Sequence, residues 1–365
     1  MGSSASFFLT KTLMTLLLSL TAIPITVNSC PSSEWAALMS IKASLKEPNF
    51  PVFQTWRGTN CCYRWFGVTC DPTTRRVTKI NLNALTITDY HRNLPATTTP
   101  YMTGHISSSI CNLTQLFSIT ISDWKGISGN IPNCITTLSF LQYLDLSGNH
   151  ITGQIPFSIG RLTLLTVLNL ADNHISGNIP DSLVSLSNLM TLDLRNNAIQ
   201  GPIPWAFGGL KKLNQALLSH NQLTGPIPPS VSKVYGLADL DLSLNRLSGS
   251  VPGWLGKMAV LDSLKLRGNK LTEEIPREVL GSRMSVLDLS GNALSGRIAN
   301  VFGAKSYFIS INLSRNNLTG SVAKSMVLAS YIGYLDLSHN RLCGAIRSAS
   351  RYAAGLQPLL MWQAA

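Results

Sequence analysis

Five carboxylates recur at near-regular intervals from residue 145 onward: Asp145, Asp193, Asp241, Asp288 and Asp336. Carboxylates held side by side can serve as an acid and a base when burial shifts their pKa values, or they can contact a ligand. A flat, solvated row has no burial to shift a pKa, so we expect no acid–base catalysis here. We favour a structural role, in which each aspartate binds nearby loop amides, over direct ligand contact.

Other residues that support catalysis or metal binding do not fall at useful spacings. The six histidines never pair at metal-ligand spacing: His91, His105, His150, His174, His220 and His339. The chain also lacks a Gly-x-Ser-x-Gly elbow, a Cys-x-x-Cys pair and a dinucleotide-binding glycine turn. The sequence therefore predicts a protein with no catalytic residues, no metal ion and no cofactor.

The spacing of the aspartates reflects an internal repeat. Nine asparagines follow one another in steps of 24 residues, with one step of 23: Asn149, Asn173, Asn197, Asn221, Asn245, Asn269, Asn292, Asn316 and Asn340. Around each asparagine the same frame returns, as in Leu141-x-x-Leu144-x-Leu146-x-x-Asn149-x-Ile151-x-Gly153-x-Ile155-Pro156. A fixed period of this length indicates a stack of one small unit.

Each unit predicts a short strand followed by a turn. Leu144 and Leu146 alternate with Asp145 and Ser147, so the leucines point inward from a strand. Stacked coils turn such leucines into continuous columns beneath a parallel sheet, and the asparagines can bond successive turns through their amides. About eleven units are predicted in residues 77–346, starting near Val77, Leu116, Leu141, Leu165, Leu189, Leu213, Leu237, Leu261, Met284, Phe308 and Ile332.

The two ends of the chain differ from the repeats. Within residues 1–29, Lys11 precedes a leucine-rich run from Leu13 to Leu20, which predicts a secretory signal peptide. No later segment approaches the roughly 20 apolar residues of a membrane helix. Residues 347–365 have no repeat pattern, and we expect a disordered or truncated tail there. Export predicts a secreted protein in which disulfides can form.

Residues 30–76 predict a cap that covers the apolar end of the first coil. Ser33 is expected to cap a helix with an apolar face formed by Trp35, Leu38, Ile41 and Leu45. For the four cysteines we favour the pairs Cys30–Cys61 and Cys62–Cys70, because neighbouring residues cannot both turn toward one partner without strain. A zinc site is the alternative, although the spacing lacks a Cys-x-x-Cys pair.

Three further cysteines lie outside the cap. Cys111 and Cys134 are one coil apart, which predicts a disulfide between neighbouring coils. Cys343 has no evident partner, so one of the seven cysteines is left over. We favour a truncated or misjoined sequence as the explanation, over an intermolecular disulfide or a partner that covers the last coil.

Exposed strand positions would form the concave face, which is the usual binding surface of a curved solenoid. The predicted partner-binding residues are the aspartates and the aromatic or basic residues that depart from the repeat pattern: Tyr143, Asp145, Asp193, Arg195, His220, Asp241, Lys265, Arg267, Asp288, Arg315 and Tyr334. About 15 extra residues between Leu82 and Gly104, with Asp89–Arg92 and Thr97–Tyr101, are a second candidate or a plain surface loop.

The net charge of +12 favours a polyanionic partner. We hypothesise retention on acidic wall polysaccharide such as pectin. Nucleic acid is disfavoured, because the signal peptide directs export and no basic stripe is interleaved with aromatic residues. Three sequons predict glycosylation at Asn112, Asn312 and Asn317, and a glycan on Asn312 would obstruct the concave face.

The repeat frame resembles the plant extracellular class of leucine-rich repeats, which the Gly-x-Ile-Pro step marks at 129–132, 177–180 and 225–228. The cap Cys30…Cys61-Cys62-Tyr-Arg-Trp-Phe-Gly-Val-Thr-Cys70-Asp is similar to the one that opens plant receptor ectodomains and polygalacturonase-inhibiting proteins. The segment 123–135 resembles most the plant proteins named for DNA-damage repair and toleration.

This resemblance implies an α/β fold: a right-handed solenoid with a curved parallel sheet on the concave face, irregular or 3-10 segments on the convex face, and a helical, disulfide-tied N-terminal cap. It implies a secreted, non-catalytic binder of a protein or peptide, in plant defence or cell-wall signalling, including inhibition of a pathogen's wall-degrading enzyme. The alternatives are a co-receptor-like ectodomain that partners a membrane receptor kinase, and a stress or DNA-damage tolerance factor.

Overall fold

The computed structural model describes residues 30–48, 51–86, 100–302, 307–322, 324–328 and 332–343. The predicted signal peptide, the tail 347–365 and residues 87–99 of the predicted insertion, including His91, lie outside the described residues.

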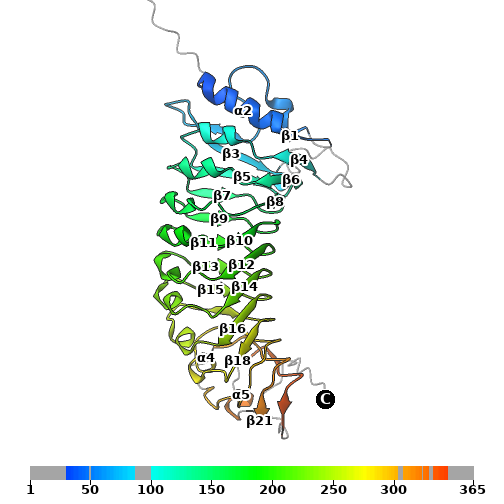
Figure 1. Ribbon diagram of the computed structural model, residues 1–365, viewed down its shortest axis with the longest axis vertical. Coiled ribbons are helices and arrows are strands. Elements are labelled where there is room, and N and C mark those ends of the chain that lie inside the picture. Colours follow the sequence, from blue (N-terminus) through cyan, green and yellow to red (C-terminus); the bar gives the residue numbers. More distant parts are fainter. Residues whose placement is uncertain are drawn as a thin grey trace, which may run out of the picture.

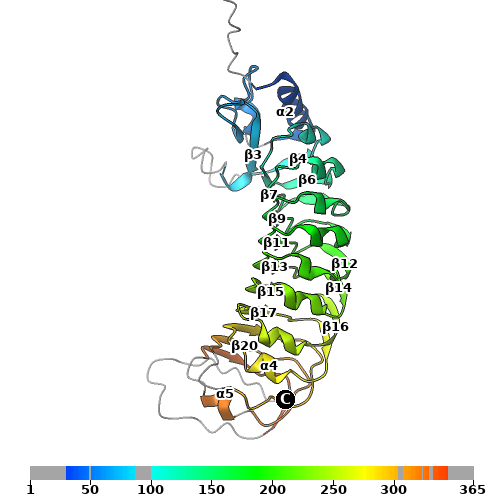
Figure 2. The same cartoon turned by 90° about the vertical axis from the view of Figure 1, so that its left-hand side faces the viewer.

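One long sheet runs through the described coils and curves with them (Figures 1 and 2). Its first strand pairs antiparallel with the second, and all later pairs are parallel and step by one coil. Figure 2 shows this sheet on the inner side of the curve, as predicted for the concave face. Its strands, in spatial order, are β2 (Val68–Cys70), β3 (Val77–Asn83), β5 (Ser118–Ser122), β7 (Tyr143–Asp145), β9 (Val167–Asn169), β11 (Thr191–Asp193), β13 (Gln215–Leu217), β15 (Asp239–Asp241), β17 (Ser263–Lys265), β19 (Val286–Asp288), β20 (Ser310–Asn312) and β22 (Tyr334–Asp336).

A second set of strands, which the sequence reasoning missed, follows the turn of each coil. These strands lie across the coils from the long sheet (Figure 1), and several of them contain the glycine of a Gly-x-Ile-Pro step, namely Gly129, Gly177, Gly201 and Gly225. One sheet holds β1 (Leu45–Lys46), β4 (Met102–His105), β6 (Lys125–Asn130) and β8 (His150–Thr152). The next holds β10 (Ser176–Asn178), β12 (Ala198–Pro202), β14 (Gln222–Gly225), β16 (Arg246–Ser250) and β18 (Lys270–Thr272), and β21 (Thr319–Gly320) pairs with β23 (Arg341–Leu342).

Short helices complete the coils and return the chain to the long sheet. They are η1 (Val52–Thr55) in the cap, then η2 (Ser108–Asn112), η3 (Asn133–Thr137), η4 (Ile159–Arg161), η5 (Asp181–Ser185), η6 (Phe207–Gly209), η7 (Pro229–Lys233), η8 (Gly253–Lys257), α4 (Arg277–Leu280) and α5 (Lys324–Leu328). Between helices and strands the repeat leucines are buried in columns, as predicted: Leu144 and Leu146 are fully buried, and Ala216 fills the same place in a later coil.

The asparagine ladder is present in the structure. In a typical coil, Asn173 Nδ2 donates to the carbonyls of Leu146, Leu170 and Ala171, and its Oδ1 accepts the N–H of Ile151. Asn173 is 6% exposed, so these bonds satisfy backbone groups that water does not reach. The same pattern links each coil to its neighbour as far as Asn340.

The ladder begins with a tryptophan. Trp124 is fully buried, and its indole Nε1 donates to the Leu82 carbonyl at 2.7 Å, as the next amide, Asn149 Nδ2, donates to Ile121. An indole has no acceptor oxygen, and the turn around Lys125 differs from the later turns. The Oδ1 atom of Asn149, the first amide of the ladder, has no hydrogen-bond partner among the described residues.

The N-terminal helix α2 (Ser32–Ser44) lies over the first coils, and its start corrects the sequence prediction. The helix begins at Ser32 with Pro31 at the N-cap position and no side-chain cap, so Ser33 does not cap it. Proline suits this place because its fixed φ is compatible with helix entry. Leu38 and Ile41 are buried as expected, whereas Trp35 is only partly buried and Glu34 is fully buried.

Glu34 joins the cap to the first repeat. Its Oε2 accepts the backbone N–H of Val77 at 2.7 Å, and its Oε1 pairs with Arg76 Nε at 2.5 Å. Val77 begins the first repeat strand and is fully buried, so a carboxylate from the helix satisfies a backbone N–H that water does not reach.

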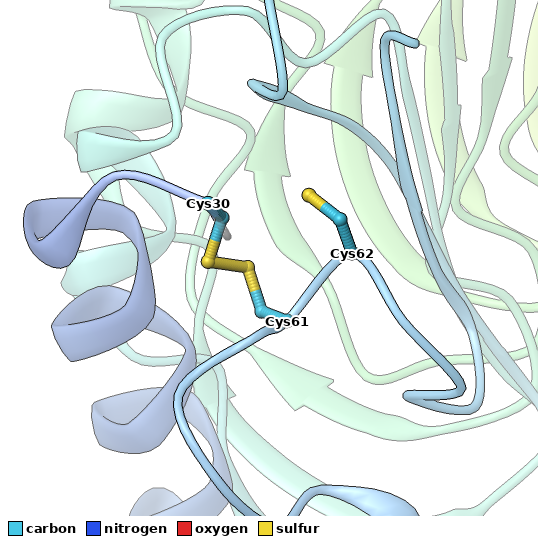
Figure 3. Close-up of side chains that lie close together, drawn as sticks. All are labelled: Cys30, Cys61 and Cys62. Atoms are coloured by element: carbon cyan, nitrogen blue, oxygen red, sulfur yellow. A yellow bond between two sulfur atoms is a disulfide. The ribbon is translucent and has the colours of Figure 1, made fainter. Parts of the chain in front are cut away.

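The cap cysteines form the favoured disulfides, Cys30–Cys61 and Cys62–Cys70. The sulfurs of Cys30, Cys61 and Cys62 lie within 4.8 Å of one another, and Figure 3 shows the bond that joins the first two. A sulfur in a disulfide is not the thiolate that zinc binds, so the disulfides account for this cluster. Cys111 and Cys134 are also bonded, while Cys343 is exposed and free.

Candidate ligand-binding face

The regular aspartates serve the turns of their own coils. Asp145, Asp241, Asp288 and Asp336 each accept, through Oδ1, the backbone N–H of the serine two residues later, at 2.9–3.0 Å. Asn169 and Asn312 use their amide oxygens in the same way in other coils. A short side chain that accepts from the residue two ahead fixes the start of a turn. The structure therefore supports the structural role favoured from the sequence.

The aspartate row is less solvated than the sequence suggested. Asp145 and Asp193 are only 9% and 5% exposed, so the expectation of a flat, solvated stripe is wrong in these coils. The sequence could not show this, because the exposure of a strand residue depends on its neighbours in the adjacent coils.

Burial raises the pKa of the Asp193 carboxyl, while the N–H and guanidinium of Arg195 act to lower it. Arg195 Nη2 lies 2.9 Å from Asp193 Oδ2, and the arginine side chain is 47% exposed. Desolvation also raises the pKa of Asp123, and the nearby charges of Asp145 and Asp172 add to the effect.

We predict that Asp193→Asn folds with a stability within about 1 kcal/mol of the wild type at pH 7, because asparagine already fills this turn position at Asn169 and Asn312. A raised folded-state pKa means that Asp193 contributes less stability as pH rises from about 4 through that pKa. The variant's stability relative to wild type should therefore improve between pH 4 and pH 7. Urea unfolding at both pH values measures this, and a relative stability that falls with pH contradicts it.

Basic and aromatic residues that depart from the repeat pattern stay accessible on this face. Arg195, His220, Arg267 and Arg315 are exposed. The remaining candidates are half-buried: Tyr143, Asp241, Lys265, Asp288 and Tyr334. His220 and Arg315 follow the strands in left-handed backbone conformation, with φ of 55° each, where glycine stands in other coils such as Gly148. Side chains at this strained position are not required by the turn itself.

Charges of both signs lie along the face. In the earlier coils, Asp123 lies in the field of Asp145 and Asp172, and Asp172 also acts on Asp193, which pairs with Arg195. The later coils carry the cations Lys265, Arg267 and Arg315 together with the carboxylates Asp288 and Asp336. In the same later coils, the pKa of the Tyr334 hydroxyl is raised, chiefly by desolvation and then by the charges of Asp336 and Asp288. The charge of Arg267 acts to lower it.

The structure places the remaining predicted residues and adds one pair. Asn112 ends η2 and is exposed, Asn317 is exposed, and Asn312 lies half-buried on the long sheet. His150 and His174, which the sequence shows only to lack metal-ligand spacing, stack with ring centroids 4.1 Å apart. Their separation of one repeat length was the signal for this contact.

Among the described residues, no helix has the length and apolar character to cross a membrane.

Family models match several parts of the chain. The leucine rich repeat N-terminal domain matches residues 31–71. Leucine rich repeat models match residues 140–162, 163–223 and 236–258.

Curated relatives share part of the solenoid. The DNA damage-repair/toleration protein DRT100 of Arabidopsis thaliana is 47% identical over 126 residues, which are 34% of this chain and 33% of that protein. Polygalacturonase inhibitor 1 of Oryza sativa subsp. japonica is 33% identical over 153 residues, 41% of this chain and 40% of the relative. The matched regions thus span a third to two fifths of these relatives.

Solved structures extend the likeness to most of the chain. A plant ice-binding protein superposes with a TM-score of 0.71 at 30% identity, covering 88% of this chain and 99% of that one. The plant peptide hormone receptor RGFR1, in complex with RGF2, gives a TM-score of 0.64 at 31% identity over 66% of this chain and 39% of the receptor. With its N-terminal cap, asparagine ladder and Gly-x-Ile-Pro coils, the chain belongs to the plant extracellular leucine-rich repeat proteins.

Proposed function

We propose that this protein is a secreted, non-catalytic binder that holds a protein or peptide on the face of the long sheet. One observation carries the proposal. The regular Asp and Asn side chains are engaged in their own turns, whereas Arg267 and Arg315 are exposed at positions where the repeat requires no arginine. Arginine is enriched among the residues that dominate binding at protein interfaces.

The mixture of charges along the face suits an extended partner that itself carries charges of both signs. Such complementarity favours the correct partner and speeds association. Structures of related receptors hold peptide ligands, such as RGFR1 with RGF2 and PEPR1 with AtPEP1, which supports a peptide or an extended protein segment as the partner class.

Among specific roles, we propose inhibition of a pathogen's wall-degrading enzyme, which the likeness to polygalacturonase inhibitors of rice and grapevine supports. The test is inhibition of purified fungal polygalacturonases by the secreted protein. Arg267→Glu should weaken inhibition by about tenfold or more, because truncating or reversing an interface arginine costs over 1 kcal/mol.

Arg161→Glu is the matched control, since this exposed arginine lies in η4 and outside the long sheet. Equal effects of Arg161→Glu and Arg267→Glu would place the contact elsewhere. If no polygalacturonase is inhibited, the inhibitor role is wrong, and binding to a library of plant peptides then tests the broader proposal.

A further inference from the structure

Two large aromatic side chains project from the same position of alternate coils, away from the long sheet. Phe157 and Trp205 each follow an Ile-Pro step and are 79% and 69% exposed. They lie between the second set of strands and the 3-10 helices in chain order, so they belong to neither the concave face nor the core. A fold stabilised by its leucine columns does not require aromatic rings here.

The two coils present these rings in the same way. The residues after them, Ser158 and Ala206, have nearly equal backbone angles, with φ −88° and ψ 17° against φ −91° and ψ 23°. The coil between them differs, because its 3-10 helix already begins at Asp181. The shared backbone directs both side chains outward from equivalent points of the stack.

The next coil holds each aromatic residue in place. Ser182 Oγ donates to the Phe157 carbonyl, and Ser230 Oγ donates to the Trp205 carbonyl at 2.6 Å. Gly160 lets this coil approach, since a Cβ there would lie 2.1 Å from the Ser182 carbonyl oxygen. Gly208 has the same relation to Ser230, at 2.5 Å. The backbone that carries the two rings is therefore fixed before any ligand arrives, which limits the entropy lost on binding.

The distance between the two rings and the carboxylate that lies between them point to one class of ligand. Two steps of the stack separate the rings by about 10 Å, from a strand spacing of ~4.8 Å. Two sugar units of an extended β-1,4-glucan span a similar length. An aromatic face packs against the CH face of a pyranose, while exposed Asp181 between the rings can accept bonds from sugar hydroxyls.

We propose that Phe157, Asp181 and Trp205 form a binding platform for a neutral, extended β-linked glucan. A carboxylate at its centre disfavours a polyanion such as pectin at this place. A protein partner is disfavoured because protein interfaces bury a contiguous apolar centre, whereas these rings are separated by a charged residue. In the seventh coil the aromatic residue, Trp254, comes one position later and packs partly against the core, so the platform ends before it.

The test is native affinity electrophoresis of the full chain in gels containing hydroxyethyl cellulose, with enough salt to suppress charge attraction. The wild-type protein should be retarded. Phe157→Ala and Trp205→Ala should each raise the apparent Kd about tenfold, and the double variant should abolish retardation. Trp205→Phe keeps a ring and should restore most of the binding.

Tyr235→Ala is the matched control, because this tyrosine is 77% exposed but stands at a different position of the coil. An unchanged circular dichroism melt separates lost binding from lost folding in every variant. No retardation of the wild type, an equal loss in Tyr235→Ala, or binding to polygalacturonate alone would overturn the proposal. Unchanged glucan binding in the double variant would do so as well.

Discussion

Replacing Asn173 with alanine is expected to lower the free energy of unfolding by about 3–5 kcal/mol, although no ligand or charge is involved. The change removes four hydrogen bonds at once, leaving the carbonyls of Leu146, Leu170 and Ala171 and the N–H of Ile151 without the side chain that satisfies them. Alanine cannot replace them, and these groups are too buried to turn to water. Urea unfolding followed by circular dichroism measures the loss.

Hydrogen exchange at the Ile151 amide gives a local readout, which should accelerate more than exchange in distant coils. Asn149→Ala is an internal comparison, because Asn149 makes the three donor bonds but its Oδ1 has no partner among the described residues. It should cost about 1–3 kcal/mol less than Asn173→Ala. Asn317→Ala, at an exposed asparagine, should change stability by under about 0.5 kcal/mol. Equal losses in all three variants would contradict a ladder.

Glu34→Ala is expected to cost about 3–5 kcal/mol, because it breaks an ion pair whose carboxylate is fully buried and leaves a buried backbone donor unsatisfied. Glu34 is fully buried between helix α2 and the first repeat strand, where it binds both Arg76 and the Val77 N–H. The loss should appear first at the N-terminal end, as faster exchange of the Val77 amide and easier unfolding of the cap.

A double-mutant cycle with Arg76→Ala separates the ion pair from general packing. The two changes should be non-additive by about 1–3 kcal/mol, because each removes the same interaction. Arg57→Ala, at an exposed arginine of the same cap, should have little effect. Additive effects at Glu34 and Arg76 would show that the two side chains do not act as a pair.

The features that the sequence revealed share one property: they recur with the repeat. The position of Asn149 in its frame predicted the turn, and its recurrence predicted a ladder. The alternation of Leu144 with Asp145 predicted the strand, and the 23-residue step from Cys111 to Cys134 predicted a disulfide between coils. Each inference needed only the knowledge that identical units stack.

Exceptions to the repeat were harder to interpret. Trp124 occupies the first ladder position and donates from its indole in place of an asparagine amide. The regular spacing of the asparagines does not reveal this substitution. Glu34 sits among apolar helix residues, and its partner Arg76 is 42 residues away. The second set of strands also escaped prediction, since Gly-x-Ile-Pro segments pair only after the coils have been brought into register.

The sequence by itself determined the class of fold, the inward leucines, the turn-forming asparagines and the disulfide between neighbouring coils, because these follow from local geometry repeated at a fixed period. Only the tertiary structure decided which side chains are accessible. Asp193 is buried while Arg195 is exposed, and Phe157 and Trp205 align on alternate coils. The physical reason is that exposure and alignment depend on the curvature of the stack and on side chains one coil away, which the chain brings together only when it folds.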